Sequence, residues 1–272
     1  MSRTFRLTLE YDGEAFAGWQ RQPGALRTVQ GALESAIARV TGQRVAVVAS
    51  GRTDAGVHAE GQVVSFRLAG ALDARRLRCA LNGVLPRDVA VLDARPVPEG
   101  FHARRDALSK CYRYAIWNGC NRSPLQARRA FCLQRRLDLE AMRAAARCFV
   151  GTHDFASFQA AGASVRSTER TLLRVDLGGR AGESLALHVE GNGFLRHMVR
   201  ILAGTLIAVG SGRWAPERMP AILAARDRCQ AGPTAPAHAL TLVAVRYTPP
   251  EVRAALRAVA APPDDFPGRS GS

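Results

Sequence analysis

The sequence predicts an α+β protein in which the order strand, helix, strand, strand, helix, strand occurs twice. In the first strand Phe5, Leu7 and Leu9 alternate with polar neighbours, as a half-buried strand requires. Thr28 is suited to cap a helix and is followed by apolar residues at helical spacing. The other elements expected in this first half are strands at 45–49, 62–68 and 89–96 and a helix at 73–81.

The second half repeats this order with one insertion. Asp138 is placed to cap a helix that continues to Phe149, and Pro216 opens a short additional helix. The remaining expected elements are strands at 109–117, 170–177, 184–190 and 240–247 and an apolar helix at 194–209. We therefore expect two ferredoxin-like halves, 1–104 and 105–248, with mainly antiparallel sheets side by side and a cleft between them. A poorly ordered tail is expected at 249–272.

The charge of the chain predicts an acidic partner. Among 272 residues, 38 are basic and 23 are acidic, which gives a formal net charge of +15. Nucleic acid fits such an excess best, so we expect the central cleft to bind RNA. Hydrophobic residues make up 47% of the chain, which excludes a disordered protein. Lys110 is the single lysine, so arginine supplies nearly all of the positive charge.

Cysteine, histidine and apolar patterns argue against a metal site or a membrane span. The six cysteines form no C-x-x-C pair, and we expect them to be reduced thiols in a cytoplasmic protein. His58, His102 and His197 are too scattered to be argued as metal ligands, so no metal is expected. No apolar run reaches the roughly 18 residues that a membrane span needs.

The loop Ser50–His58 lies between two predicted strands and holds the best candidate for a reactive group. Gly51 and Gly56 allow unusual backbone angles and close approach to a ligand. Arg52 stands two residues before Asp54 and favours the charged form of its carboxylate. An ionised carboxylate held in such a loop suits a nucleophile or a general base. Asp-Ala-Gly is also an ordinary turn, so this motif taken alone favours a structural role.

Two further stretches combine aromatic and basic residues, which suits binding of a nucleobase and its phosphate. The first joins Phe101–Arg105 to Lys110 and Tyr112. The second, Gly191–Arg200, opens a predicted helix whose N-terminal N–H groups favour anions. Sheet packing explains the tyrosine, and helix capping explains the second stretch, so both structural interpretations stay open here.

Seven motifs occur together along the chain, over about residues 4–248. They are Tyr11–Gly13, Gly18–Gln22, Gly51–His58, Phe101–Arg104, Lys110–Tyr114, Gly191–Arg200 and Ala235–Leu242. In this order they resemble the tRNA pseudouridine synthase A family, also called TruA. The resemblance implies an isomerase that converts uridine to pseudouridine at positions 38, 39 and 40 of the tRNA anticodon stem-loop. It also implies a homodimer, no cofactor and two fused ferredoxin-like halves around an RNA cleft.

The resemblance also assigns roles to individual residues. Asp54 is the catalytic nucleophile, Arg52 pairs with it, and Tyr112 stacks on the uracil and is a candidate for removal of the C5 proton. The other residues that it assigns to substrate binding are Phe101, His102, Arg104, Lys110 and Leu240. Ala239 departs from the family pattern, where glycine is usual, and is expected to shift the loop that touches the substrate.

The residues leave two alternatives open. A non-catalytic RNA-binding protein would share the charge and the fold, but the set Arg52, Asp54 and Tyr112 argues against it. A phosphoryl-transfer enzyme is disfavoured because the chain has no G-x-x-x-x-G-K-[ST] motif. For the synthase itself, the residue pattern does not choose between attack of the carboxylate at C1′ of the sugar and attack at C6 of the ring.

Overall fold

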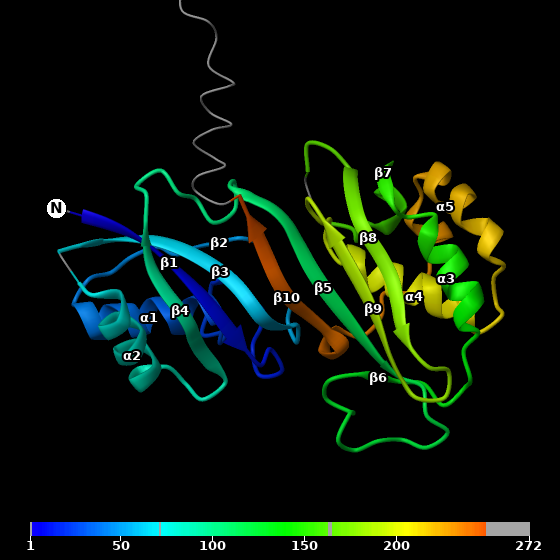
Figure 1. The fold of residues 1–272 in the computed structure, drawn as a ribbon, viewed down its shortest axis with the longest axis horizontal. Coiled ribbons are helices and arrows are strands. Elements are labelled where there is room, and N and C mark those ends of the chain that lie inside the picture. Colours follow the sequence, from blue (N-terminus) through cyan, green and yellow to red (C-terminus); the bar gives the residue numbers. More distant parts are fainter. Residues whose placement is uncertain (1, 71, 163–164, 249–272) are drawn as a thin grey trace, which may run out of the picture.

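The computed structural model describes residues 2–70, 72–162 and 165–248. Within these residues it forms a single sheet of ten strands, with one group of helices beside the N-terminal strands and another beside the C-terminal strands (Figure 1). The α+β class predicted from the sequence is confirmed. The expected tail, 249–272, lies outside the described residues.

The first part of the chain closely follows the predicted order. Its elements are β1 (Ser2–Tyr11), α1 (Val29–Thr41), β2 (Val48–Ala49), β3 (His58–Ala69), α2 (Ala74–Val84) and β4 (Val89–Val97). Thr28 caps α1 as predicted, since its side chain accepts a hydrogen bond from Gly31 N. The strand expected at 45–49 is shorter, because only Val48 and Ala49 pair with β3.

The second part adds two short strands to the predicted set. Its elements are β5 (Ala107–Trp117), β6 (Phe131–Cys132), α3 (Leu139–Arg147), β7 (Gly151–Asp154), η1 (Ala156–Phe158), β8 (Glu169–Gly179), β9 (Ser184–Gly191), α4 (Met198–Gly210), η2 (Pro216–Arg218), α5 (Met219–Ala225), η3 (Arg228–Gln230), η4 (Ala237–Ala239) and β10 (Leu240–Tyr247). Asp138 caps α3 as predicted. The apolar helix begins at Met198 rather than at Phe194, because His197 has a left-handed backbone with φ of 60°. None of the helices described is long and apolar enough to cross a bilayer.

The strands meet edge to edge in one sheet of order β4-β1-β3-β10-β5-β9-β8-β7, with β2 and β6 beside this path. The two sheets that we expected side by side are therefore joined. The junction is short, because β10 runs parallel to β3 over only two residue pairs, Thr241–His58 and Leu242–Ala59. β10 pairs antiparallel with β5 along its other edge, so the last strand lies between the two parts of the chain.

The two faces of the sheet differ in character, because successive strand residues point to opposite sides. The face toward the helices is apolar, and Leu7, Tyr114, Leu187 and Leu242 on it are 1% exposed or less. On the opposite face, six charged residues of β3, β5, β8, β9 and β10 form three ion pairs, Arg113–Glu60, Arg174–Asp176 and Arg246–Glu190. We call these six residues the paired face.

Helix α4 is almost completely buried and supports the loop that precedes η4. Gly232 N donates a 2.9 Å hydrogen bond to the hydroxyl of Thr205, so the backbone of the loop lies directly on the helix. At the same contact, a Cβ added to Gly204 would lie 1.8 Å from Pro233 O. Glycine at this position is therefore required by the backbone of the crossing loop.

Gly204→Ala is expected to destabilise the protein by about 3 kcal/mol, because the new methyl group overpacks a contact with backbone that has little room to move. Gly83→Ala in α2 is the matched control, since a Cβ there meets nothing within 4 Å. The control is expected to leave stability unchanged or raise it by up to about 1 kcal/mol. Urea unfolding measures both changes, and equal unfolding free energies for the two variants would contradict the close contact.

Candidate active site

Asp54 lies in the loop between β2 and β3, and a buried glutamine fixes the start of this loop. Gln62 of β3 is 0% exposed. Its Nε2 donates to Gly51 O over 2.9 Å, and its Oε1 accepts from Ser50 Oγ over 2.7 Å. These bonds join a strand of the sheet to the loop backbone, so the loop has a defined conformation before any ligand binds.

The segment Tyr11–Trp19, which we call the covering segment, packs against the same loop from its other side. The hydroxyl groups of Tyr11 and Thr53 lie 2.8 Å apart, and Trp19 N donates to Thr53 O over 3.0 Å. Burial raises the pKa of Tyr11 to about 12, so its phenol stays protonated at neutral pH. Thr53 is thus held through both its side chain and its backbone, immediately before Asp54.

Close approach explains two glycines of this covering segment. A Cβ on Gly13 would lie 2.0 Å from Val57 O, and a Cβ on Gly18 would lie 2.9 Å from Thr53 O. Gly18 also has φ of +96°, a conformation that other residues rarely adopt. Glycine at positions 13 and 18 therefore lets the covering segment lie in close contact with the backbone of the Asp54 loop.

Asp54 faces two basic side chains at the start of α4. Arg200 Nη1 donates to Asp54 Oδ2 over 3.3 Å, and His197 Nε2 lies 3.5 Å from the same oxygen. Within the described residues no hydrogen bond reaches Oδ1. The Asp54 side chain is 34% exposed. Arg200 and His197 thus face one carboxylate oxygen, and the carboxylate group is not closed off from solvent.

Arg52 does not take the position expected of it. Its side chain is exposed, and in the part of the chain that the structure describes it makes no hydrogen bond or ion pair. The expected pairing of Arg52 with Asp54 is therefore wrong, because Arg200 takes that place from 146 positions further along the chain. Contact between Arg52 and a substrate stays a prediction.

Arg200 is itself held rigidly. Its Nε donates to Ala235 O over 2.8 Å, and its own carbonyl accepts from Ala235 N over 3.1 Å. Ala235 belongs to the loop that lies on α4 at Gly204. The guanidinium therefore has little freedom to follow any movement of Asp54.

His197 combines backbone strain with an electrostatic constraint. Its left-handed backbone is unusual for a residue other than glycine, and such strain tends to occur at functional sites. Burial lowers its pKa, the charge of Asp54 opposes this, and Arg200, Arg196 and Arg228 lower it further. A neutral imidazole beside the carboxylate follows at neutral pH. The residues described contain no cluster of three His, Cys, Asp or Glu side chains suited to a metal.

Tyr112 of β5 lies in the same site as Asp54. Its ring is 7% exposed and meets the ring of Phe194 edge-on, with centroids 5.1 Å apart. Burial raises the pKa of Tyr112 well above its ordinary value, and electrostatic interactions with Tyr11 and Asp54 add to the effect. The phenol is therefore protonated at neutral pH, and the ring is fixed by its aromatic neighbour.

Leu240 begins β10 and is 5% exposed, opposite Tyr114 of β5. The preceding turn is tied to the sheet, because the Tyr114 hydroxyl donates to Pro236 O over 3.1 Å. Ala239 in this turn is 1% exposed, and its φ lies outside the left-handed region. Alanine fits there without backbone strain, although glycine is the residue that the resemblance leads one to expect.

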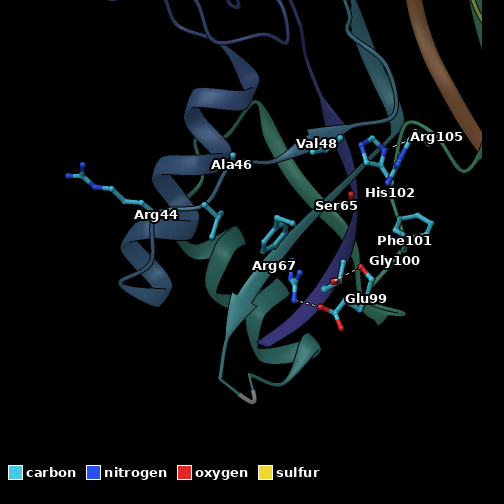
Figure 2. Close-up of a pocket in the computed structure, with 13 residues that line it drawn as sticks. Arg44, Ala46, Val48, Ser65, Arg67, Glu99, Gly100, Phe101, His102 and Arg105 are labelled. Carbon is cyan, nitrogen blue, oxygen red and sulfur yellow. Dashed lines mark hydrogen bonds and ion pairs between the residues drawn. The ribbon is translucent and has the colours of Figure 1, made fainter. Parts of the chain in front are cut away.

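Phe101 and His102 line a separate cleft of about 450 Å³ between β3, the segment before β2 and the loop after β4 (Figure 2). Neither Asp54 nor Tyr112 is among the described residues that line it. The structure therefore does not bring these two predicted residues to the Asp54 loop. Their contact with a substrate stays a prediction.

The ring of His102 has a defined hydrogen-bonding state. Its Nδ1 accepts backbone N–H bonds from Arg104 and Arg105 over 3.2 and 3.1 Å. The proton of the neutral ring is therefore on Nε2. In Figure 2 the side chain of Arg44 extends away from the cleft, and Arg67 is paired with Glu99.

Lys110, in contrast, reaches the Asp54 loop. It stands two residues before Tyr112 on the same face of β5. A Cβ added to Gly51 would lie 3.2 Å from Lys110 Cε, so the lysine stem runs alongside the loop.

The sequence signals for some of these residues were used only in part. His197 and Arg200 lie in the stretch Gly191–Arg200 that we expected to favour anions, but neither was expected to contact Asp54. Gln62 is a polar residue beside the apolar run Val63–Val64 of a predicted strand. Nothing in the sequence indicated that these residues meet around Asp54.

Gly18→Ala is expected to lower the unfolding free energy by about 1–3 kcal/mol more than Gly24→Ala. Both glycines have positive φ, +96° and +88°, so both variants carry backbone strain. A Cβ at position 18 also clashes with Thr53 O. A Cβ at position 24 has no atom within 4 Å. Denaturant unfolding of the two variants measures the difference. Equal losses would show that the covering segment does not press on the Asp54 loop.

Known proteins are similar to this chain over most of its length. A family model described as tRNA pseudouridine synthase matches residues 8–106 and 145–248. The chain is 45% identical over 245 residues to tRNA pseudouridine synthase A of Geotalea uraniireducens, covering 90% of this chain and 100% of that protein. It is 49% identical over 245 residues to the protein of the same name from Moorella thermoacetica, covering 89% and 98%.

Likeness to solved structures is weaker. A crystal structure of an archaeal box H/ACA sRNP complex shares 13% identity with a TM-score of 0.34, covering 75% of this chain and 44% of that one, which is too little to inform the fold. The family model and the curated relatives are decisive. They show that the chain belongs to the tRNA pseudouridine synthase family.

Proposed function

We propose that this protein isomerises uridine to pseudouridine at positions 38, 39 and 40 of the tRNA anticodon stem-loop, with Asp54 as the nucleophile. The observation that carries the proposal is the Asp54 carboxylate, which Arg200 holds at one oxygen and whose charge helps to raise the pKa of Tyr112. The family membership supports the reaction and the class of RNA. The choice of the anticodon stem-loop rests on the sequence motifs.

The proposed reaction conserves every atom of the uridine. The N1–C1′ bond breaks, the uracil turns within the site, and a C5–C1′ bond forms. The proton lost from C5 is balanced by the proton gained at N1. Because nothing is oxidised or added, the proposal includes no cofactor.

Asp54 fits the nucleophilic role because its two oxygens have different surroundings. Oδ2 is bound by Arg200, so Oδ1 is the oxygen presented to the substrate. Attack at C1′ and addition at C6 both use this oxygen. In either route Arg200 stabilises the carboxylate again when its bond to the substrate breaks.

Tyr112 fits a stacking role. The target base has to leave its stack in the RNA, which costs a few kcal/mol, and an aromatic ring offsets part of that cost. Phe194 holds the ring of Tyr112 edge-on, so the stacking surface is fixed in advance. Because burial keeps the phenol protonated, stacking is better supported than removal of the C5 proton.

The remaining assignments are also proposals. Arg52, Phe101, His102, Arg104, Lys110 and Leu240 are proposed to contact the tRNA. The strand orders β4-β1-β3-β2 and β10-β5-β9-β8 support two ferredoxin-like halves, since the fourth strand, the first, the third and the second follow one another in both. A homodimer and a cytoplasmic location rest on the sequence, and the mass of the protein in solution tests the first.

Asp54→Asn is expected to lower pseudouridine formation at least about 1,000-fold while tRNA affinity is largely kept, because the amide is a poor nucleophile of similar shape. Asp176→Asn on the paired face is the matched control and is expected to retain activity, since Asp176 contacts Arg174 away from the Asp54 loop. The measurement maps pseudouridine in one unmodified tRNA incubated with each protein. Undiminished activity of Asp54→Asn would contradict the assignment of Asp54 as the nucleophile.

The same experiment separates the competing functions. Product confined to the anticodon stem-loop supports the proposed specificity, and product in the T-arm overturns it. Binding without any product from the wild-type protein is the result expected of a non-catalytic RNA-binding protein.

Tyr112→Phe is expected to keep tRNA affinity close to wild type, and Tyr112→Ala to weaken it about tenfold, because stacking of one base on an aromatic ring contributes about 1–3 kcal/mol. Phenylalanine preserves the ring that packs on Phe194, whereas alanine removes it. Equilibrium binding of unmodified tRNA measures both values. Equal affinities for the two variants would contradict a stacking role.

A further inference from the structure

His58 joins two segments of the chain through a buried imidazole. It is the last residue of the Asp54 loop and the first of β3, and its side chain is 3% exposed. Its Nε2 lies 3.0 Å from His238 O, in the turn before β10, 180 positions further along the chain. Because a carbonyl oxygen only accepts hydrogen bonds, Nε2 carries a proton and donates it.

The other nitrogen of the His58 ring meets the covering segment. Gly13 N donates to Nδ1 over 3.1 Å, and Asp12 Oδ1 lies 3.1 Å from the same nitrogen. A neutral ring accepts from Gly13, and a protonated ring donates to Asp12, whose other oxygen accepts from Arg129 over 2.8 Å. In both states Nε2 donates to His238 O, so this bond does not depend on the charge of the ring.

A short turn connects His58 to Asp54. Val57 N donates to Asp54 O over 3.2 Å, which closes the turn one residue before His58. Gly56 within it has φ of +79°, and a Cβ added there would lie 3.4 Å from the Cβ of Ala237. The Asp54 loop therefore lies against residues 235–239 at two points, Gly56 and His58. We call residues 235–239 the bridging turn.

The bridging turn also holds Arg200. Ala235 N donates to Arg200 O over 3.1 Å, and Ala235 O accepts from Arg200 Nε over 2.8 Å. The carbonyl that accepts from His58 is that of His238, three residues later. One short turn is thus bound both to the loop that carries Asp54 and to the guanidinium that faces Asp54.

Asp54 and Arg200 are consequently linked in two ways. The direct link is the hydrogen bond from Arg200 Nη1 to Asp54 Oδ2, which at 3.3 Å is longer than the roughly 2.7–2.9 Å usual for charged partners. The indirect link runs through His58 and the bridging turn. Because the imidazole is buried whereas the Asp54 side chain is 34% exposed, the indirect link is better shielded from water.

We propose that His58 is a positioning residue for the isomerisation, and that its bond to His238 O sets the place of the Asp54 carboxylate relative to Arg200. This role rests on the proposed function, because it takes Asp54 as the reacting group. His58 acts through the backbone of the loop and of the bridging turn and does not touch the substrate. Its loss slows the chemical step more than it weakens tRNA binding, since a small displacement of a reacting group mainly affects the rate.

His58→Asn and His58→Gln separate the two bonds of the ring. Asparagine places a polar atom near the position of Nδ1 but is too short to reach His238 O, whereas the amide nitrogen of glutamine can reach the position of Nε2. His58→Asn is expected to lower kcat for pseudouridine formation at least about tenfold, with KM for unmodified tRNA within about twofold of wild type. His58→Gln is expected to keep kcat within about threefold of wild type.

Three results of this comparison would overturn the positioning role. They are an unchanged kcat in His58→Asn, an equal loss of kcat in both variants, and a rise of KM at unchanged kcat. Thermal unfolding establishes that each variant is folded at the assay temperature, so that a loss of kcat is not a loss of folded protein.

His153→Asn is the matched control. Nε2 of His153 also lies 3.1 Å from a backbone oxygen, that of Val150, but His153 belongs to β7 at the edge of the sheet. This variant is expected to keep the wild-type kcat. A loss as large as that of His58→Asn would show a general effect of removing a bond from histidine to backbone, and would also overturn the proposal.

Arg200→Lys tests whether His58 acts through Arg200. Lysine keeps the positive charge but lacks the Nε that bonds to Ala235 O. In this background His58→Asn is expected to lower kcat less than about threefold, because the geometry that His58 maintains is already lost. A further tenfold loss would show that the two residues act independently.

Hydrogen exchange in the full-length protein tests the link without turnover. The Val57 amide, which bonds to Asp54 O, is expected to be protected in wild type and in His58→Gln and to exchange at least about tenfold faster in His58→Asn. Exchange in the wild type as fast as in an unstructured peptide would overturn the link, whatever the variants do.

Failure of the positioning role is distinguishable from failure of the proposed function. Product from the wild type together with an unaffected His58→Asn refutes the positioning role and leaves the proposed function standing. Wild-type protein that forms no pseudouridine and still protects Val57 refutes the proposed function, and the positioning role with it, while the structural link remains.

Discussion

The ion pair between Asp54 and Arg200 is the contact on which the arrangement of the site depends. It joins the loop after β2 to the first turn of α4, across 146 positions of sequence. Each partner is fixed by its own neighbours, Asp54 through Gln62 and the covering segment, and Arg200 through Ala235. Two rigid pieces therefore meet at one carboxylate oxygen. Preorganisation of this kind lets a substrate be bound without first reordering the groups that act on it.

The site also contains features that oppose folding. His197 has a strained left-handed backbone, which costs about 1–3 kcal/mol, and Lys110 is surrounded by like charges. Some charges away from the site are arranged in the ordinary way, as with the bidentate pair of Arg27 and Asp88. Similar features also occur elsewhere, since Arg226 has a left-handed backbone and burial together with Arg95 lowers the pKa of Arg6. A large buried core supplies the stability that makes them tolerable.

Local patterns predicted most of the elements, because caps and periodicity are properties of neighbouring residues. Thr28 and Asp138 cap the helices assigned to them, and the strand at 240–247 has the predicted bounds. Contacts between distant residues were not predictable in this way. Nearness in sequence suggested Arg52 as the partner of Asp54, whereas the fold supplies Arg200. The left-handed backbone of His197, after which α4 begins at Met198, was not predictable either. It changes the backbone angles of one residue and leaves no trace in the spacing of the apolar residues.

The short junction between β3 and β10 has a consequence for how the protein is made. β10 is the last strand in the sequence, yet it lies between β3 and β5 and pairs with both. During synthesis the two neighbouring strand edges therefore stay open until the residues up to Tyr247 have left the ribosome. The turn that holds Arg200 through Ala235 is also among the last segments to emerge. The site around Asp54 can therefore be completed only after these late segments have emerged, and the strand edges that β10 covers are open to association with other chains until then.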